Sequence, residues 1–365
     1  MGRALRAGIV GLPNAGKSTL FNALTASQVP AEAYPFTTID PNVGVVEVPD
    51  PRLTHLADIL RPPRVVPAIV EFVDIAGLVE GAHRGEGLGN RFLAHIREVE
   101  TIVHVVRCFD DPDVVRPSSS ADALQDVEVI DTELVLADLE AVENRLDRIR
   151  RLARSGDRAA QAEERLLDRL REALDSGRAV REAELNEEEE AIVRSLFLLT
   201  KKPVLYIANI TESDLGAGGE CAGTLRSAVG DGGESLALCC KLEAELLNFE
   251  PTEREEYLQA LGLDSPGVHA LIRATYRLLD LITFFTFNEK EVRAWTVRRG
   301  ARTPEAAGVV HTDFEKGFIR AETVAYEDFR GVGSYKLARD KGLARAEGRD
   351  YVVQDGDILL FRARA

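Results

Sequence analysis

Residues 11–18 read Gly-Leu-Pro-Asn-Ala-Gly-Lys-Ser, and this stretch decides the fold expected for the first part of the chain. It fits the pattern G-x-x-x-x-G-K-[ST] at every fixed position. An apolar run ends just before it at Val10, and apolar residues at helical spacing follow it. A strand, a glycine-rich turn and a helix in this order direct backbone amides at a phosphate. We therefore predict a nucleotide-binding loop whose contacts are Asn14, Ala15, Gly16, Lys17, Ser18 and Thr19.

Three side chains and one amide carry the chemistry predicted for this loop. Lys17 would reach the β- and γ-phosphates, and the Ser18 hydroxyl would ligate Mg²⁺. Asp74 ends an apolar strand, and Gly77 follows it three residues later. Downstream of a phosphate-binding loop, this arrangement predicts that Asp74 holds the metal and that the Gly77 amide senses the γ-phosphate.

The segment between these two motifs contains the adjacent threonines Thr37 and Thr38. We expect Thr38, with Thr37 as the alternative, to close over the magnesium ion when the γ-phosphate is present. Leu78 stands where related hydrolases carry a glutamine that orients the attacking water. Intrinsic hydrolysis is therefore expected to be slow. Asn14 is a candidate ligand for a potassium ion beside the phosphates, because related loops with asparagine at this place use one.

The pattern along the chain predicts an α/β fold interrupted by a helical segment. Apolar runs at residues 8–10, 44–46, 69–73 and 102–106 alternate with helical stretches, which indicates a parallel sheet. Residues 129–200 are charged and poor in glycine. Two seams of apolar residues in this region, separated by a break at 155–157, predict two helices that fold back as a hairpin. Strand character returns at residues 203–207, so the hairpin is expected to be an insertion.

The last region is expected to form a small sheet with one or two helices. Residues 284–287 and 292–297 have strand character, and residues 350–361 are expected to give two short strands around Gly356. Thr312 and Glu315 have the spacing of a capping box at a helix start.

Composition limits the classes of protein to consider. The chain has 365 residues and a formal net charge of −16, which argues against coating nucleic acid through bulk charge. The four cysteines have neither metal-site spacing nor a disulfide framework, and adjacent Cys239 and Cys240 are expected to be reduced thiols. The chain has neither a secretion signal nor an apolar stretch of the roughly 20 residues that a membrane span needs. We therefore expect a cytoplasmic protein with no membrane partner.

Several stretches resemble a known family. Residues 11–18, 34–42 and 74–90 are similar to the Obg-like branch of the translation-factor class of P-loop nucleoside triphosphatases. Within that branch, the chain resembles the YchF subfamily, the Obg-like ATPases, at residues 104–109, 206–209, 293–297 and 311–325. The resemblance covers nearly the whole chain. It implies a Ras-like P-loop G domain with an inserted α-helical coiled-coil hairpin and a C-terminal β-grasp domain of the TGS type. The expected divisions are 1–128 and 201–281 for the G domain, 129–200 for the insertion and 282–365 for the last domain.

Residues 209–212, Asn-Ile-Thr-Glu, bear on which base is bound. GTPases generally carry Asn-Lys-x-Asp here, and the aspartate accepts hydrogen bonds from both N1–H and N2–H of guanine. The Glu212 side chain is longer than aspartate and cannot accept these two hydrogen bonds from the same place, so guanine loses the pair. The family resemblance implies adenine instead. Asn209, Ile210 and Glu212, together with Cys239 and Cys240, are therefore predicted to surround the base.

The resemblance implies an ATP-binding and ATP-hydrolysing molecular switch that uses Mg²⁺, with K⁺ as a further candidate, and that acts with the ribosome or a ribosomal subunit. One alternative is a GTPase of the Obg type in ribosome assembly. A second is a nucleotide-sensing scaffold in which hydrolysis is incidental. RNA contact is also considered, through the TGS-like domain or through arginines in the insertion and the last region, namely Arg145, Arg148, Arg150, Arg151, Arg154, Arg298, Arg299 and Arg302. A run of charged residues is more often a solvent-exposed face than a site of RNA contact.

Overall fold

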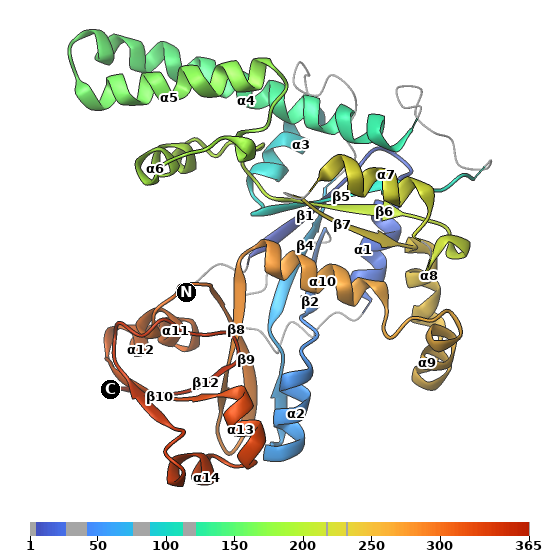
Figure 1. The fold of residues 1–365 in the computed structure, drawn as a ribbon, viewed down its shortest axis with the longest axis vertical. Helices are drawn as coiled ribbons and strands as arrows, with labels where there is room; N and C mark the ends of the chain where they lie inside the picture. The colour runs from blue at the N-terminus through green and yellow to red at the C-terminus, as the bar shows by residue number, and fades with distance from the viewer. Residues whose placement is uncertain are drawn as a thin grey trace.

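Two six-stranded sheets organise the molecule (Figure 1). The computed structural model describes residues 5–26, 42–75, 88–111, 122–216, 218–230 and 233–364. The first sheet and the helices around it lie beside the second sheet. A long pair of helices crosses the other face of the first sheet, and its free end projects on the left in Figure 1, the side on which the second sheet also lies.

The first sheet has the order β2-β4-β1-β5-β6-β7. Strand β2 is antiparallel to β4, and the other neighbours are parallel. Each apolar run predicted in this region lies in one of its strands. Their bounds are β1 (Arg6–Val10), β2 (Val43–Glu47), β4 (Ile69–Asp74), β5 (Thr101–Arg107), β6 (Val204–Asn209) and β7 (Glu234–Leu238).

Helices cover both faces of this sheet, which makes the region a mixed α/β layer structure. On one face, α1 (Lys17–Thr25) and α10 (Gly267–Leu278) contribute Leu20 and Leu271 to a buried apolar cluster. On the other face, α3 (Leu88–Arg97), α4 (Ala123–Arg154) and α7 (Glu220–Val229) contribute Ile96, Ile130 and Leu225 to a second cluster. The other helices of this region are α8 (Cys240–Glu245) and α9 (Pro251–Ala260), with short 3-10 turns at η4 (Glu212–Asp214) and η5 (Leu246–Asn248).

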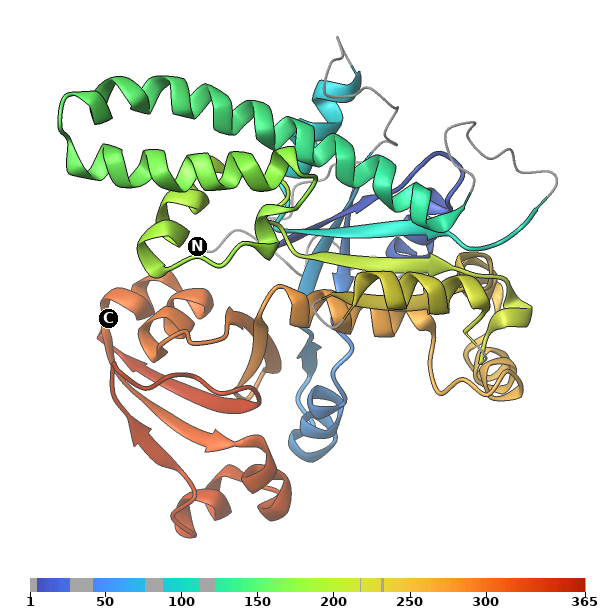
Figure 2. The same ribbon diagram turned by 45° about the horizontal axis from the view of Figure 1, so that its top comes forward.

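The helical hairpin is formed by α4 and α5 (Arg158–Asp175), which run side by side in Figure 2. Apolar residues of α4 and the leucines of α5 form one buried cluster, as the two predicted seams required. The helices are separated at residues 155–157, and the Asp157 side chain caps α5 by accepting a hydrogen bond from Ala160 N at 3.0 Å. Helix α4 begins at Ala123, so it crosses the boundary predicted at residue 128. The return path contains η3 (Val180–Glu182) and α6 (Glu187–Leu196).

The second sheet has the order β11-β10-β12-β8-β9-β3. Five of its strands come from the last region: β8 (Leu281–Phe287), β9 (Glu291–Arg298), β10 (Phe318–Ala325), β11 (Arg345–Glu347) and β12 (Asp357–Ala363). Its helices are α11 (Thr303–Val310), α12 (Thr312–Lys316), α13 (Tyr326–Val332) and α14 (Tyr335–Asp340).

Two local predictions for this region are wrong. The predicted capping box does not form, because Thr312 is already helical and the N-cap of α12 is His311, whose Nδ1 accepts a hydrogen bond from Asp313 N at 3.2 Å. Residues 350–361 do not give two strands around Gly356. They contain the start of β12, and Val352 makes only an isolated bridge to Arg302.

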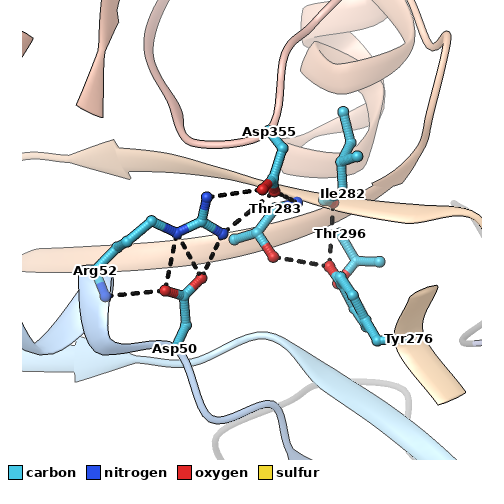
Figure 3. A network of polar contacts seen from close by, with 7 residues as sticks. All are labelled: Asp50, Arg52, Tyr276, Ile282, Thr283, Thr296 and Asp355. Atoms are coloured by element: carbon cyan, nitrogen blue, oxygen red, sulfur yellow. Dashed lines mark hydrogen bonds and ion pairs between the residues drawn. The ribbon is translucent and has the colours of Figure 1, made fainter. Parts of the chain in front are cut away.

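The sixth strand of the second sheet comes from the first region of the chain. Strand β3 (Arg64–Val66) pairs in parallel with β9, and it follows α2 (Pro51–Leu60). Figure 3 shows the polar network that accompanies this pairing. The Arg52 guanidinium lies between two carboxylates, with Nη2 2.7 Å from Asp50 Oδ2 and Nη1 2.8 Å from Asp355 Oδ2. Asp355 in turn accepts a hydrogen bond from Thr283 N at 2.9 Å. The two sheets are therefore joined by charge-assisted hydrogen bonds as well as by a strand pair.

The cysteines differ from expectation in one respect. Cys108, just after β5, forms a disulfide with Cys221 in α7, although the sequence suggested no disulfide framework. The pair is 113 residues apart, so its proximity depends on the packing of α7 against the sheet. Cys239 and Cys240 are free and buried, in agreement with the predicted thiols. Over the ranges that the structure describes, no helix has the length and apolar character required to cross a membrane.

Candidate nucleotide-binding site

The predicted phosphate-binding loop connects β1, at the centre of the first sheet, to α1. In sheets of this kind, ligands bind at the carboxyl ends of the parallel strands. Gly16 is the N-cap of α1 and has a φ of 102°, and Asn14 also has a positive φ, of 62°. A Cβ atom on Gly16 would lie 2.3 Å from Nδ2 of Asn209. The loop therefore needs glycine at position 16 both for its backbone conformation and for the close approach of a neighbouring side chain.

Lys17, Ser18 and Asp74 converge beside this loop. The Lys17 ammonium donates a hydrogen bond to Leu12 O at 2.8 Å, and the Ser18 hydroxyl lies 3.4 Å from Asp74 Oδ2. Burial lowers the pKa of Lys17, and the charge of Asp74 opposes this shift. Burial raises the pKa of Asp74, and Lys17 and the Ser18 hydroxyl oppose that shift. Both charges are poorly solvated, so a bound phosphate and a metal ion would stabilise them.

Asn209, at the end of β6, links the loop to α8. Its Nδ2 donates to Ala15 O at 2.9 Å, and its Oδ1 accepts from Cys240 N at 3.0 Å. The side chain is only 5% exposed. Its amide is thus used to hold two parts of the site together. A direct contact with a base was also predicted for this side chain, and it stays a prediction.

The other predicted base-contacting residues differ in exposure. Ile210 is 3% exposed and packs in the core, so any contact with a base falls to its backbone. Glu212 is exposed at the start of η4. Cys239 is the N-cap of α8, and burial raises the pKa values of the Cys239 and Cys240 thiols. Burial therefore favours the neutral thiol form of both cysteines, and their contact with a base stays a prediction.

Some predicted residues lie outside the described ranges. These include Thr38, its alternative Thr37, Gly77 and Leu78. Their predicted parts in closing the site and positioning water stay predictions. Thr19, which was expected to contact the nucleotide, is exposed in the first turn of α1.

One contact at this edge of the sheet was not predicted. The Tyr257 hydroxyl, on α9, donates a hydrogen bond to Oε1 of Glu212 at 2.8 Å. The two residues are 45 positions apart and belong to no common motif. Only the packing of α9 next to η4 reveals the pair.

Comparison with known proteins agrees with this geometry. Residues 6–137 match a family model described as "50S ribosome-binding GTPase". Residues 281–364 match the YchF-GTPase_C model, whose description is "Protein of unknown function (DUF933)". A relative from Bacillus subtilis (strain 168), named "Ribosome-binding ATPase YchF", is 49% identical over 362 residues, covering 98% of this chain and 99% of the relative.

The chain belongs to the YchF family. A relative of the same name from Escherichia coli O157:H7 is 48% identical over 356 residues, with 98% of each chain covered. A solved YchF structure, described as "Structure of the Schizosaccharomyces pombe YchF GTPase", superposes with a TM-score of 0.90 at 36% identity, covering 99% of this chain and 98% of that one. The mixed α/β fold with a P-loop is thus that of YchF proteins. The two bacterial relatives are named ATPases, whereas the solved structure is described as a GTPase.

Proposed function

We propose that this protein is an ATP-hydrolysing molecular switch that acts with the ribosome in the cytoplasm. The observation that carries the proposal is the convergence of Lys17, Ser18 and Asp74 at the carboxyl ends of the central strands. Lys17 would bind phosphate oxygens. The Ser18 hydroxyl and the Asp74 carboxylate face each other and offer the oxygen ligands that Mg²⁺ prefers. When bound, the metal neutralises charge on the phosphates.

Adenine is the proposed base. Glu212 replaces the aspartate that reads guanine in GTPases, and Ile210, whose side chain is buried, replaces the lysine that packs on the base. The names of the curated relatives, which state an ATPase, support the same choice. The alternative is a GTPase, and the description of the solved fission yeast relative favours it.

The remaining parts of the site are proposed on the family resemblance. Thr38 would close over the metal, the Gly77 amide would sense the γ-phosphate, and turnover would be slow because Leu78 cannot orient water. Asn14 would take part in binding K⁺. Equal rates of hydrolysis in sodium and potassium would count against this last assignment.

The finer division of the chain is also a proposal. The helical hairpin would be the family's coiled-coil insertion, and residues 282–365 would be its β-grasp TGS domain, with the G domain at 1–128 and 201–281. The leucine-lined contact between α4 and α5 supports the first assignment. The mixed sheet around β8, β9, β10 and β12 supports the second.

Ribosomal contact is proposed for the exposed surfaces of the hairpin and of the second sheet. Two arginines of α4 already have acidic partners on α5. Arg145 lies 2.6 Å from Glu163, and Arg150 lies 3.2 Å from Asp168. These pairs reduce the positive charge that the predicted basic stripe can present to RNA. On α4, the exposed arginines of the predicted set are Arg148, Arg151 and Arg154.

Competition binding with Mg²⁺ tests the nucleotide assignment. ATP should displace a fluorescent ATP analogue more effectively than GTP does, and Lys17→Ala should abolish binding. Lys290→Ala, at an exposed turn remote from the loop, is the control. A protein that prefers GTP tenfold would contradict the adenine assignment, and one that binds neither nucleotide would contradict the switch altogether.

Co-sedimentation with ribosomes tests the partner. We expect more protein on the ribosome with a nonhydrolysable ATP analogue than with ADP, and no such difference for Lys17→Ala. Nucleotide-independent binding that survives Lys17→Ala would instead favour the scaffold in which hydrolysis is incidental.

A further inference from the structure

We propose that Tyr257 is a positioning residue for base selection, because its hydroxyl donates to one carboxylate oxygen of Glu212, orients the carboxylate and leaves the other oxygen as the better acceptor for a single donor of adenine. This assignment rests on the proposed function, in which Glu212 meets the base. Tyr257 belongs to none of the sequence motifs that indicate nucleotide binding.

The position of Glu212 makes it reachable from the site. It is the first residue of η4 and lies three residues after Asn209. The Asn209 side chain links the phosphate-binding loop to the start of α8. The charge of Glu212 also acts on the Cys239 thiol at the N-cap of α8. Glu212 therefore lies next to the two segments that are predicted to border the base.

Tyr257 is held in place by its own surroundings. Its ring packs edge-on against Phe249, with centroids 5.3 Å apart, and joins a small apolar cluster that contains Cys239 and Leu246. Arg254 fixes the turn before α9, because its Nε donates to Leu246 O at 2.9 Å. The hydroxyl is thus presented to Glu212 from a packed support, and little conformational entropy remains to be lost when it binds.

The hydrogen bond sets the direction of the Glu212 carboxylate and makes one of its oxygens a weaker acceptor for a further donor. Tyr257 donates to Oε1 of Glu212 at 2.8 Å. This bond raises the pKa of the Tyr257 hydroxyl, which therefore stays protonated and remains the donor near neutral pH. Guanine recognition by a carboxylate uses two parallel donors, N1–H and N2–H, on both oxygens. The exocyclic amino group of adenine needs only one oxygen. Oε1 keeps a second lone pair, but it is the weaker acceptor once Tyr257 donates to it, and the carboxylate no longer presents two equal oxygens to a pair of donors. This arrangement favours adenine over guanine.

Tyr257→Phe tests the inference, because it keeps the ring and its packing and removes only the hydroxyl. The chain also offers a matched control, since the Tyr335 hydroxyl donates to Glu322 Oε2 at 2.7 Å in the second sheet region. We expect Tyr257→Phe to lower the preference for ATP over GTP by about tenfold, the value of one hydrogen bond to a charged group. Tyr335→Phe should leave the preference unchanged. The affinity for ATP should fall, while kcat and the melting temperature of Tyr257→Phe stay near wild type.

The outcomes separate this inference from the proposed function. If the wild-type protein prefers ATP and Tyr257→Phe keeps that preference within twofold, Tyr257 does not position Glu212 for the base. A fall in kcat and melting temperature without a change in selectivity would show a merely structural tyrosine and also overturn the inference. A wild-type protein that binds both nucleotides equally would overturn adenine selection itself, and the part assigned to Tyr257 with it.

Discussion

Arg52→Ala should lower the free energy of unfolding of the second sheet region by about 2 kcal/mol. In the wild type, the Arg52 guanidinium makes hydrogen bonds to both oxygens of Asp50 and to both oxygens of Asp355 (Figure 3). It also lies over the Phe285 ring, 5.4 Å from the centroid. The substitution removes all of these contacts and leaves the Asp50 carboxylate, whose side chain is 9% exposed, without its cation.

Exposure sets the size of this effect. Loss of one partner of a fully buried pair costs about 3–5 kcal/mol, whereas exposed pairs contribute about 0.2–1 kcal/mol. The Arg52 side chain is 25% exposed and that of Asp355 is 45% exposed, so the network lies between these limits. Asp50 also keeps one hydrogen bond in the variant, because it accepts from the backbone N–H of residue 52 at 2.9 Å. A value near the middle of the range follows.

The sequence supplies a reporter for the measurement. Trp295 is the single tryptophan of the chain, and it lies in β9, next to β3. Urea unfolding followed by its fluorescence therefore reports on the second sheet, while far-UV circular dichroism reports on the whole molecule. Arg299→Ala is the matched control, because Arg299 pairs with Asp280 at 3.2 Å and both side chains are about two-thirds exposed. It should change stability by less than about 0.5 kcal/mol. If Arg52→Ala destabilises the protein no more than Arg299→Ala does, the network does not join the two sheets.

Three further predictions concern single positions. Gly16→Ala should abolish nucleotide binding in a titration, because the added Cβ meets the Asn209 side chain at 2.3 Å. Gly156→Ala is the control: its φ is 92° but the space around it is open, so it should cost only about 1 kcal/mol of stability and leave binding intact. Burial lowers the pKa of His104 to about 3, so the free energy of unfolding should fall as the pH drops from about 6.5 towards 3. His104→Leu should remove up to about 1.4 kcal/mol per pH unit from that slope, as measured by urea unfolding at several pH values. The Cys108–Cys221 disulfide joins residues 113 positions apart, so Cys221→Ser should lower the free energy of unfolding by up to about 4–5 kcal/mol. The stability of the variant should not change with dithiothreitol. If dithiothreitol destabilised the variant as much as the wild type, this prediction would be wrong.

The sequence predicted the parts of the site that depend on short contiguous patterns. The loop around Lys17 and the strand that ends at Asp74 lie where the motif and the apolar run placed them. The strand predicted at residues 203–207 is β6, which continues to Asn209. These elements are predictable because strand, turn and helix preferences act over a few neighbouring residues. The same reasoning located the break between α4 and α5, where a glycine lies between two apolar seams.

Features that depend on distant residues were missed or wrong. The Cys108–Cys221 pair and the contact between Tyr257 and Glu212 join segments that meet only through tertiary packing. The capping box at Thr312 failed because the His311 side chain caps the helix one residue earlier. Strand β3 was not predicted, since three residues are too few for a periodic pattern and its partner β9 lies more than 200 positions away.

The position of β3 has a practical consequence for dissecting the molecule. A fragment limited to residues 281–364, the part matched by the C-terminal family model, would lack the strand that covers one side of β9. Its bare backbone groups would then be available to pair with other copies, a common route to insoluble material. The complementary fragment would carry residues 64–66 with no strand to pair with. Truncated forms of this protein should therefore retain residues 50–66 together with the C-terminal region, or supply an equivalent strand in their place.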